Sequence, residues 1–250
     1  MQLDNKDNIM TAAQQIVKNV ESLGTDRVFS IADLGLPAEW WENIRVKLSR
    51  MVKSGTLVKI APGKYYRPRI SILGPVPPST ENLIRDILYR DGNIEGYLTT
   101  YSVWDSMGLT TQFSSTVVIG LNYRKDTINR DGRVVQFILQ PNRITTETIP
   151  LLQILDSIKF IKSIPDTSIA NSVERLSEII RTFDDSQVKL LIELAMKYPP
   201  RVRALLGAIL DKNGNDAQTS PLHKSLNPLT EYRIGISDET LPTKQNWRIV

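Results

Sequence analysis

The basic residues between Asn43 and Arg69 constrain the fold of this chain more than any other feature. Eight of them lie there with no acidic residue, where a helical pattern gives way to a β-hairpin pattern. They are Arg45, Lys47, Arg50, Lys53, Lys59, Lys64, Arg67 and Arg69. A basic helix followed by a basic hairpin is what a winged helix-turn-helix presents to DNA. We therefore expect residues 1–72 to form a winged helix that binds double-stranded DNA.

The net charge of +4 is confined to the same part of the chain. Residues 1–72 hold 11 Lys and Arg against 7 Asp and Glu, whereas residues 73–250 hold 20 of each kind. Affinity for a nucleic-acid backbone depends on clustered positive charge, so the excess marks the N-terminal part as the candidate interface. The remainder is expected to have the neutral surface of an ordinary globular domain.

Three helices are expected before the hairpin. Apolar residues at helical spacing predict the first over residues 9–23. Ser30, with Asp33 three residues later, has the spacing of a capping box and predicts a brief second helix. The third is expected over 38–54, because Pro37 suits a helix start and Gly55 a helix end.

The third helix is expected to bury one stripe and to present the other to DNA. The apolar stripe consists of Trp41, Ile44, Leu48, Met51 and Val52. The opposite face carries Asn43, Lys47, Arg50 and Lys53. Asn and Arg can pair bidentately with adenine and guanine, so this face is the candidate recognition surface. The alternative is a basic face that is only solvated.

The hairpin that follows supplies the candidate wing. Two β-rich segments, 56–60 and 65–67, enclose the turn sequence at 61–64. The wing side chains expected to contact the phosphate backbone are Lys59, Lys64, Arg67 and Arg69. Tyr65 and Tyr66 should face opposite sides of the strand, so one is expected in the core, and Tyr66 is the candidate phosphate ligand.

A proline-rich linker over 73–79 is expected to separate the winged helix from a second domain, residues 80–250. The second domain mixes helical and strand patterns. Helices are expected at 80–90, 97–106, 148–163, 169–181, 186–198 and 200–211, and strands at 115–122 and 133–139. The expected fold class is α+β (mixed): an N-terminal winged helix-turn-helix with a larger C-terminal α/β domain.

Signals of catalysis or metal binding are missing from the sequence. There is no cysteine, His223 is the single histidine, and the acidic pair Asp184-Asp185 precedes a helix, where it suits a cap. No glycine-rich phosphate-binding motif is present. We therefore expect no catalytic residue, no cofactor and no metal. No apolar run approaches the ~20 residues that span a membrane, and the polar segment 1–8 is unlike a signal peptide, so a cytoplasmic location is expected.

Several segments resemble the AbiEi family, the antitoxins of bacterial type IV toxin–antitoxin systems. The more specific ones are PGKYYRP at 62–68, preceded by LSRMVKSG at 48–55, and GLTTQ at 108–112. Looser matches lie at 198–207 and 226–230. The resemblance spans most of the chain.

The resemblance implies a function for each domain. The winged helix would bind inverted repeats in the promoter of its own operon and repress it. The second domain would neutralise a nucleotidyltransferase-type toxin encoded next door, without a stable complex. In GLTTQ, Thr110, Thr111 and Gln112 are candidate antitoxin residues, unless they only complete a helix end at Gly108. The alternative functions are a winged-helix protein-interaction module, or a stand-alone transcriptional regulator without a toxin.

Overall fold

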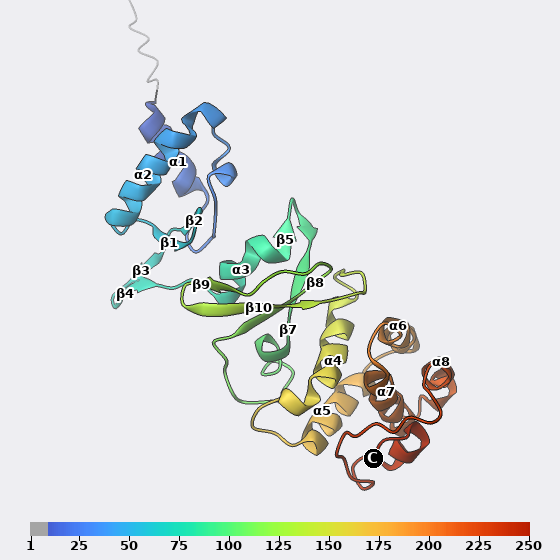
Figure 1. Ribbon diagram of the computed structural model, residues 1–250. Helices are drawn as coiled ribbons and strands as arrows, with labels where there is room; N and C mark the ends of the chain where they lie inside the picture. Colours follow the sequence, from blue (N-terminus) through green and yellow to red (C-terminus); the bar gives the residue numbers. More distant parts are fainter. Residues whose placement is uncertain (1–9) are drawn as a thin grey trace, which may run out of the picture. The chain divides into compact units, whose positions relative to one another are not determined.

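The computed structural model describes residues 10–250, which contacts divide into two compact units (Figure 1). The first extends to Asp91 and includes Asn129–Gly132; the second comprises Gly92–Ile128 and Arg133–Val250. The fold is α+β, with a winged helix-turn-helix in the first unit and a larger α/β fold in the second, as predicted. The expectations for residues 1–8, and for a helix start at Ile9, fall outside the described residues.

The helices of the first unit follow the predicted order. They are α1 (Ala12–Ser22), the 3₁₀ helices η1 (Ala32–Leu34) and η2 (Ala38–Trp40), and α2 (Trp41–Lys53). Thr11 caps α1 through a capping box with Gln14. The Asp33 carboxylate accepts hydrogen bonds of 2.6 Å from both the backbone N–H and the hydroxyl of Ser30. Local capping chemistry therefore sets these helix starts.

The wing consists of β1 (Val58–Ala61) and β2 (Lys64–Tyr66), paired antiparallel. Phe29 forms an isolated β-bridge to β2, in which its N–H donates to the Tyr65 carbonyl at 2.8 Å and its carbonyl accepts from the Tyr65 N–H at 2.9 Å. Helices and wing share one core, made of Ile16, Val20, Phe29, Leu34, Ile44, Leu48, Met51, Leu57 and Tyr65. The sheet thus fixes the wing to the helices.

A second hairpin occupies part of the expected linker. It consists of β3 (Arg69–Ser71) and β4 (Gly74–Val76). The turn forms because Gly74 adopts a φ of +106° and the Ser71 hydroxyl donates to the Gly74 carbonyl at 3.0 Å. The extended linker predicted over 73–79 is therefore wrong for its first half, where Gly74–Val76 forms a strand of this hairpin.

Helix α3 (Thr80–Leu88) begins where predicted, because the Ser79 hydroxyl accepts from the Asn82 N–H at 3.2 Å. Contacts group this helix with the first unit, so the chain divides at Asp91, whereas the sequence places the second domain from residue 80. The physical reason is Asp86 on α3, which pairs with Lys64 and Arg130 of that unit. A short hairpin of β5 (Tyr89–Arg90) and β6 (Asn93–Ile94) follows.

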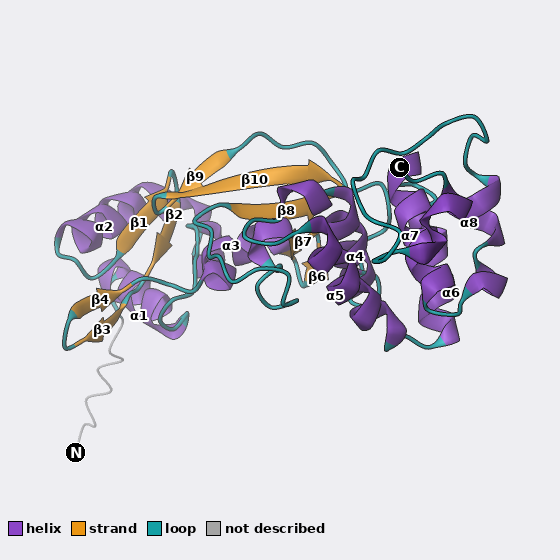
Figure 2. Ribbon diagram, turned by 90° about the horizontal axis from the view of Figure 1, so that it is seen from below, coloured by secondary structure: helices purple, strands orange, loops and turns teal. Residues whose placement is uncertain are grey.

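The main sheet has four strands in the order β7-β8-β10-β9. Their bounds are β7 (Gly96–Thr99), β8 (Val117–Leu121), β9 (Ile128–Arg130) and β10 (Arg133–Leu139). Strand β8 pairs antiparallel with β7 and parallel with β10, and Figure 2 shows β8 and β10 side by side. The strands predicted at 115–122 and 133–139 are confirmed.

The helix predicted over 97–106 is wrong at its start, because Gly96–Thr99 forms β7. A 3₁₀ helix, η3 (Thr100–Ser102), and turns follow it. The strand lies so close to β8 that a Cβ on Gly96 would come within 2.6 Å of the Leu121 side chain. Pairing with a distant strand therefore overrides the local helical pattern here.

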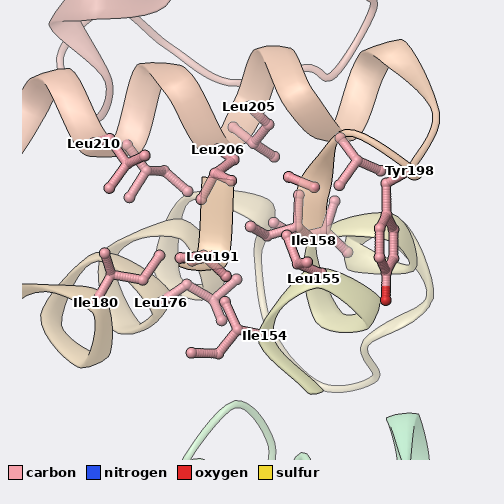
Figure 3. Packing of buried hydrophobic residues seen from close by; sticks show 14 of the residues in the cluster. Ile154, Leu155, Ile158, Leu176, Ile180, Leu191, Tyr198, Leu205, Leu206 and Leu210 are labelled. Atoms are coloured by element: carbon pink, nitrogen blue, oxygen red, sulfur yellow. The ribbon is translucent and has the colours of Figure 1, made fainter. Parts of the chain in front are cut away.

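Helices form the rest of the second unit. They are α4 (Ile149–Lys159), η4 (Ile161–Ser163), α5 (Ile169–Arg181), α6 (Asp185–Ala195), α7 (Pro200–Lys212), η5 (Asp216–Gln218), α8 (Ser220–Lys224) and η6 (Pro242–Trp247). Their apolar faces meet in one core, in which Leu155, Leu176, Leu191 and Leu206 come from α4, α5, α6 and α7 (Figure 3). The four helices predicted after residue 148 are confirmed, and Asp184 caps α6 with Gln187.

A network of polar side chains is buried in this unit around Asp156, which is 1% exposed. Its Oδ2 accepts from the Tyr97 hydroxyl at 2.6 Å and from the Thr99 hydroxyl at 2.8 Å, and its Oδ1 accepts from the Tyr198 hydroxyl at 2.8 Å. The Gln140 amide donates to both tyrosine oxygens at 2.8 Å. Burial raises the pKa of Asp156, although the three hydroxyl donors oppose the rise.

Candidate nucleic-acid interface

The exposed face of α2 carries three of the predicted DNA-binding side chains. Asn43, Arg50 and Lys53 are exposed there, whereas the buried residues of the helix are Ile44, Leu48 and Met51. The 3.6-residue period of the helix explains this division. In the described part of the chain, neither Arg50 nor Lys53 has an ion-pair partner, so both charges are available to a ligand.

Two further residues lie on this exposed face. Ser49 is exposed, and Val46 is 45% exposed. A hydroxyl can hydrogen-bond to base edges or phosphates, and an apolar side chain can contact the methyl group of thymine. Ser49 was not predicted as a site residue; its place next to Lys53 and Val46 on the helical wheel is the signal that identifies it.

The prediction that Trp41 belongs to the apolar stripe is wrong. Trp41 is 44% exposed, and the neighbouring Trp40 packs against the core of the unit instead. The reason is local geometry, because residues 38–40 form the 3₁₀ turn η2 and α2 begins only at Trp41. A helical period read from α2 places Trp41, its first residue, with the buried side chains and does not predict its exposure.

Lys47 and Lys59 have no ion-pair partner among residues 10–250, yet they differ in exposure. Lys47 is half-buried at the margin of the α2 face, and Lys59 on β1 is exposed. Lys59 is therefore the wing residue whose charge is most accessible to a phosphate.

Lys64 is held within the unit by Asp86 of α3. Its ammonium lies 3.0 Å from one carboxylate oxygen of Asp86, and the buried Arg130 pairs with the same carboxylate. Burial alone would raise the pKa of Asp86, but hydrogen bonds and charges from Arg130 and Lys64 outweigh it and lower the pKa. Lys64 thus ties the wing to α3.

Arg67 and Arg69 also have partners inside the first unit. The exposed Arg69 forms an ion pair with Asp26, which is buried. The half-buried Arg67 donates from Nη2 to the Glu21 carbonyl at 3.5 Å. The Asp26 N–H donates to the Arg67 carbonyl at 2.8 Å, so both arginines brace the same segment.

Tyr65 and Tyr66 are both buried, which corrects the expectation that only one would be. The two residues pair in regular register with Lys59 and Val58, and only Tyr65 belongs to the core shared with the helices, so the alternation holds but both sides of the strand are covered. Tyr66 is 3% exposed, and burial, with Asp131 and Asp26 nearby, raises its pKa. Its place in the packed interior gives it no route to a phosphate.

The GLTTQ segment lies on the surface of the second unit. Gly108 has a φ of +69°, and the Thr110 hydroxyl donates to the Pro165 carbonyl at 2.8 Å and accepts from the Gln112 N–H at 3.1 Å. Thr110 is buried, whereas Thr111 and Gln112 are exposed. Thr110 therefore fixes the segment, and the next two side chains face solvent.

The structure assembles no catalytic group around His223, which is exposed and lies edge-on to Trp247 at 5.3 Å between ring centroids. In residues 10–250, no three acidic or histidine side chains gather as metal ligands would. Over the same residues, no helix combines the length and the apolar character needed to cross a membrane.

Comparisons with known proteins identify a structure with a similar fold and a family whose model matches the sequence. The structure is similar to the crystal structure of the RV2827C protein from Mycobacterium tuberculosis, with a TM-score of 0.54 and 16% sequence identity over 87% of this chain and 83% of that one. This likeness concerns the fold alone. No curated protein matches. The model of a family of unknown function, DUF6088, matches residues 15–188, and because this is more than half of the chain, the protein belongs to that family.

Proposed function

We propose that this protein binds double-stranded DNA in a sequence-dependent manner through α2 and the wing. The observation that carries the proposal is the exposed face of α2, where Asn43, Arg50 and Lys53 project without acidic partners among the described residues. Arg and Asn supply the bidentate donors that read base edges in the major groove. Lys59 supplies a free charge on the wing for the phosphate backbone.

The rigidity of the first unit supports this proposal. Backbone hydrogen bonds between Phe29 and Tyr65 join the wing to the helices, and Asp86 ties Lys64 to α3. A base-reading helix is effective only when its side chains keep their register on the duplex. Lys64, Arg67 and Arg69 act in this scheme as braces for the α2 face.

The wider role that we propose follows the resemblance to AbiEi antitoxins. The DNA would be inverted repeats in the promoter of the protein's own operon, with binding repressing transcription. The second unit would neutralise a nucleotidyltransferase-type toxin without a stable complex, with the exposed Thr111 and Gln112 as candidate contacts. In this scheme the protein is not an enzyme, acts in the cytoplasm, and needs no cofactor.

A second candidate function is supported by two exposed apolar side chains of α2. Trp41 and Val46 are both more than two-fifths exposed on α2, and exposed aromatic and aliphatic groups are characteristic of protein-binding surfaces. A winged-helix protein-interaction module, or a regulator without a toxin, is therefore the alternative.

A band-shift titration of the full chain on its own upstream DNA, with scrambled competitor at two salt concentrations, tests the proposal. We expect a competitor-resistant complex whose affinity falls with salt, with a log–log slope of about −0.9 for each phosphate contact. Arg50→Ala should relax the preference at particular bases by about 1–3 kcal/mol. Lys59→Ala should reduce the slope by about one unit without changing sequence preference.

Lys224→Ala, an exposed lysine of α8, is the matched control and should leave binding unchanged. An equal loss on all sequences from Arg50→Ala would contradict the role of α2 in base recognition. No shift even at low salt would favour the protein-interaction alternative. The antitoxin role is tested separately: co-expression with the toxin candidate encoded beside it should restore growth, and should do so even with Arg50→Ala.

A further inference from the structure

Two cavities of the second unit share a wall formed by Phe160 and Ser163. The first, of about 160 Å³, lies between the end of α4 and the start of α7. The second, of about 230 Å³, is lined by residues of η3, β8 and β10. Because Phe160 and Ser163 line both, the two cavities are adjacent, so one ligand with two chemically different parts can contact both.

The first cavity is strongly cationic. Four basic side chains line it and no acidic one does: Lys159, Lys162, Arg201 and Arg233. Main-chain carbonyls hold two of them, because Arg201 Nη2 donates to the Lys159 carbonyl and Lys162 Nζ to the Arg233 carbonyl, both at 3.0 Å. None of the four has an ion-pair partner among residues 10–250. Lys162, Arg201 and Arg233 are exposed, so their positive charges are accessible to a ligand in this cavity.

Such a site suits a ligand with several negative charges. Arg and Lys are the side chains that bind phosphate groups, Arg through its planar fork and Lys as a point charge. Four basic residues around one cavity exceed what a single carboxylate would need. A chain of phosphates matches them in both charge and number of oxygen acceptors.

The second cavity has the character of a base-binding site. Tyr101 and Phe160 provide aromatic surface, and Val118 and Ile138 are apolar neighbours. Gln136 on β10 is exposed at the same wall, and its amide makes no hydrogen bond in the described structure. Aromatic rings stack on nucleobases, and an amide can donate to and accept from a base edge.

Thr100 gives independent evidence that the second cavity takes a ligand. It lines the cavity, it is 3% exposed, and its hydroxyl is buried without a hydrogen-bond partner in the described structure. Its φ of +50° is also a conformation that non-glycine residues seldom adopt. Unsatisfied polar groups and strained backbone are rare in packed interiors and concentrate where ligands bind.

We propose that the second unit binds a free nucleoside triphosphate, with the phosphates in the cationic cavity and the base in the aromatic one. Lys162 and Arg201 hold the phosphates. Gln136 distinguishes between bases, and Thr100 lines the nucleoside end of the site. The site uses no residue of α2 or the wing, so the proposal is independent of DNA binding and can fail separately from it.

Calorimetric titration of the full chain with ATP, GTP, CTP and UTP, and then with AMP and adenosine, tests the proposal. We expect at least one of the four triphosphates to bind. AMP should bind more weakly than ATP, and adenosine more weakly than AMP, because each has fewer phosphate groups. Arg201→Gln and Lys162→Gln should each weaken binding about tenfold, because each removes a charge-assisted contact. Both side chains are exposed, so melting temperatures should stay near that of the wild type.

Lys224→Gln is the matched control, because this exposed lysine lies outside both cavities. Gln136→Ala should change the order of affinity among the four triphosphates, a result that loss of charge alone cannot give. Absence of binding by all four at millimolar concentration would overturn the proposal. An equal loss with Lys224→Gln would also overturn it, by showing a diffuse charge effect. Binding of a 5′-triphosphorylated RNA hexamer in place of the free nucleotides would assign the site to a nucleic-acid strand.

Discussion

Each unit of the molecule contains an aspartate that is at least partly buried, and the two aspartates have partners of opposite kinds, charged in one unit and uncharged in the other. In the first unit, Asp86 pairs with Lys64 and Arg130, and its pKa is lowered. In the second unit, Asp156 accepts hydrogen bonds from three uncharged hydroxyl groups, and its pKa is raised. The pKa of an aspartate is therefore raised where burial dominates, as at Asp156, and lowered where charged partners outweigh burial, as at Asp86.

The difference reflects how each unit uses polar groups. The first unit has a small core, an ion pair joins α3 to the wing, and Arg50 and Lys53 of α2 have no ion-pair partner among the described residues. The second unit has a large core, and its polar network joins β7 to α4 and to the segment before α7 from within. Charge in the first unit is available to ligands, whereas the hydroxyl network of the second fixes its interior.

The largest effect is expected from Asp86→Ala. The substitution leaves the buried Arg130 guanidinium without its carboxylate partner, so we expect the free energy of unfolding to fall by about 3–4 kcal/mol. Urea denaturation followed by tryptophan fluorescence measures it, because Trp40 and Trp41 lie in the first unit. Glu81→Ala, at an exposed position of the same helix, is the control. Equal, small losses from both variants would show that the ion pairs contribute little.

A smaller loss is expected from Asp156→Ala, although Asp156 is the more deeply buried of the two. The variant leaves three hydroxyl groups without an acceptor, which lowers stability, but it also removes a carboxyl whose burial is itself unfavourable. We expect a net loss of about 2–3 kcal/mol. The fluorescence of Trp104 and Trp247 reports on this unit. Asp105→Ala, at an exposed position, is the control, and a loss larger than that of Asp86→Ala would reverse the comparison.

The two aspartates should also respond oppositely to pH. Stability from Asp86 is present above the ordinary carboxyl pKa of about 3.9 and is lost as the pH falls through its lowered native value. At low pH, Asp156 is protonated in both the folded and the unfolded protein. As the pH rises through the raised pKa that Asp156 has in the folded protein, the folded state loses stability relative to the unfolded state. The stability of Asp86→Asn relative to the wild type should therefore increase as the pH is lowered. The stability of Asp156→Asn relative to the wild type should increase as the pH is raised towards neutral.

Denaturation at several pH values between 3 and 7 measures both differences, and each unit of pKa shift corresponds to about 1.4 kcal/mol. Other titrating groups are common to the wild type and the variants, so their contributions cancel in the comparison. A change in the same direction for both variants would show that burial, and not the charge of the partners, determines how these carboxyls titrate.

Sequence patterns predicted the elements whose causes are local. The helix expected at 169–181 has those bounds in the structure, because Ser168 caps it and its apolar positions recur at helical spacing. Strand β7 was not predicted, because Tyr97 and Thr99 are fixed by Asp156, more than 50 residues away in sequence. Such pairings are set by tertiary packing, which no local window contains.

The same limit applies to the candidate interface. The exposed positions of Asn43, Arg50 and Lys53 follow from helical periodicity, which a single sequence contains. The partners of Lys64 and Arg69 do not, because Asp86 and Asp26 come from other parts of the chain. Counting basic residues therefore overestimates the number of charges that are free for DNA.

The smallest effect separates the cations that form ion pairs within the first unit from those that we propose to bind DNA. Lys64→Ala breaks a partly exposed ion pair, so we expect a stability loss of about 0.5–1 kcal/mol and little change in the salt slope of DNA binding. Lys59→Ala should lower the salt slope of DNA binding and leave stability almost unchanged, because Lys59 has no ion-pair partner among residues 10–250 and is exposed. Urea denaturation and band shifts on the same two variants measure both quantities. A lower salt slope for Lys64→Ala would mean that DNA draws this lysine away from Asp86, and that the wing carries two phosphate contacts instead of one.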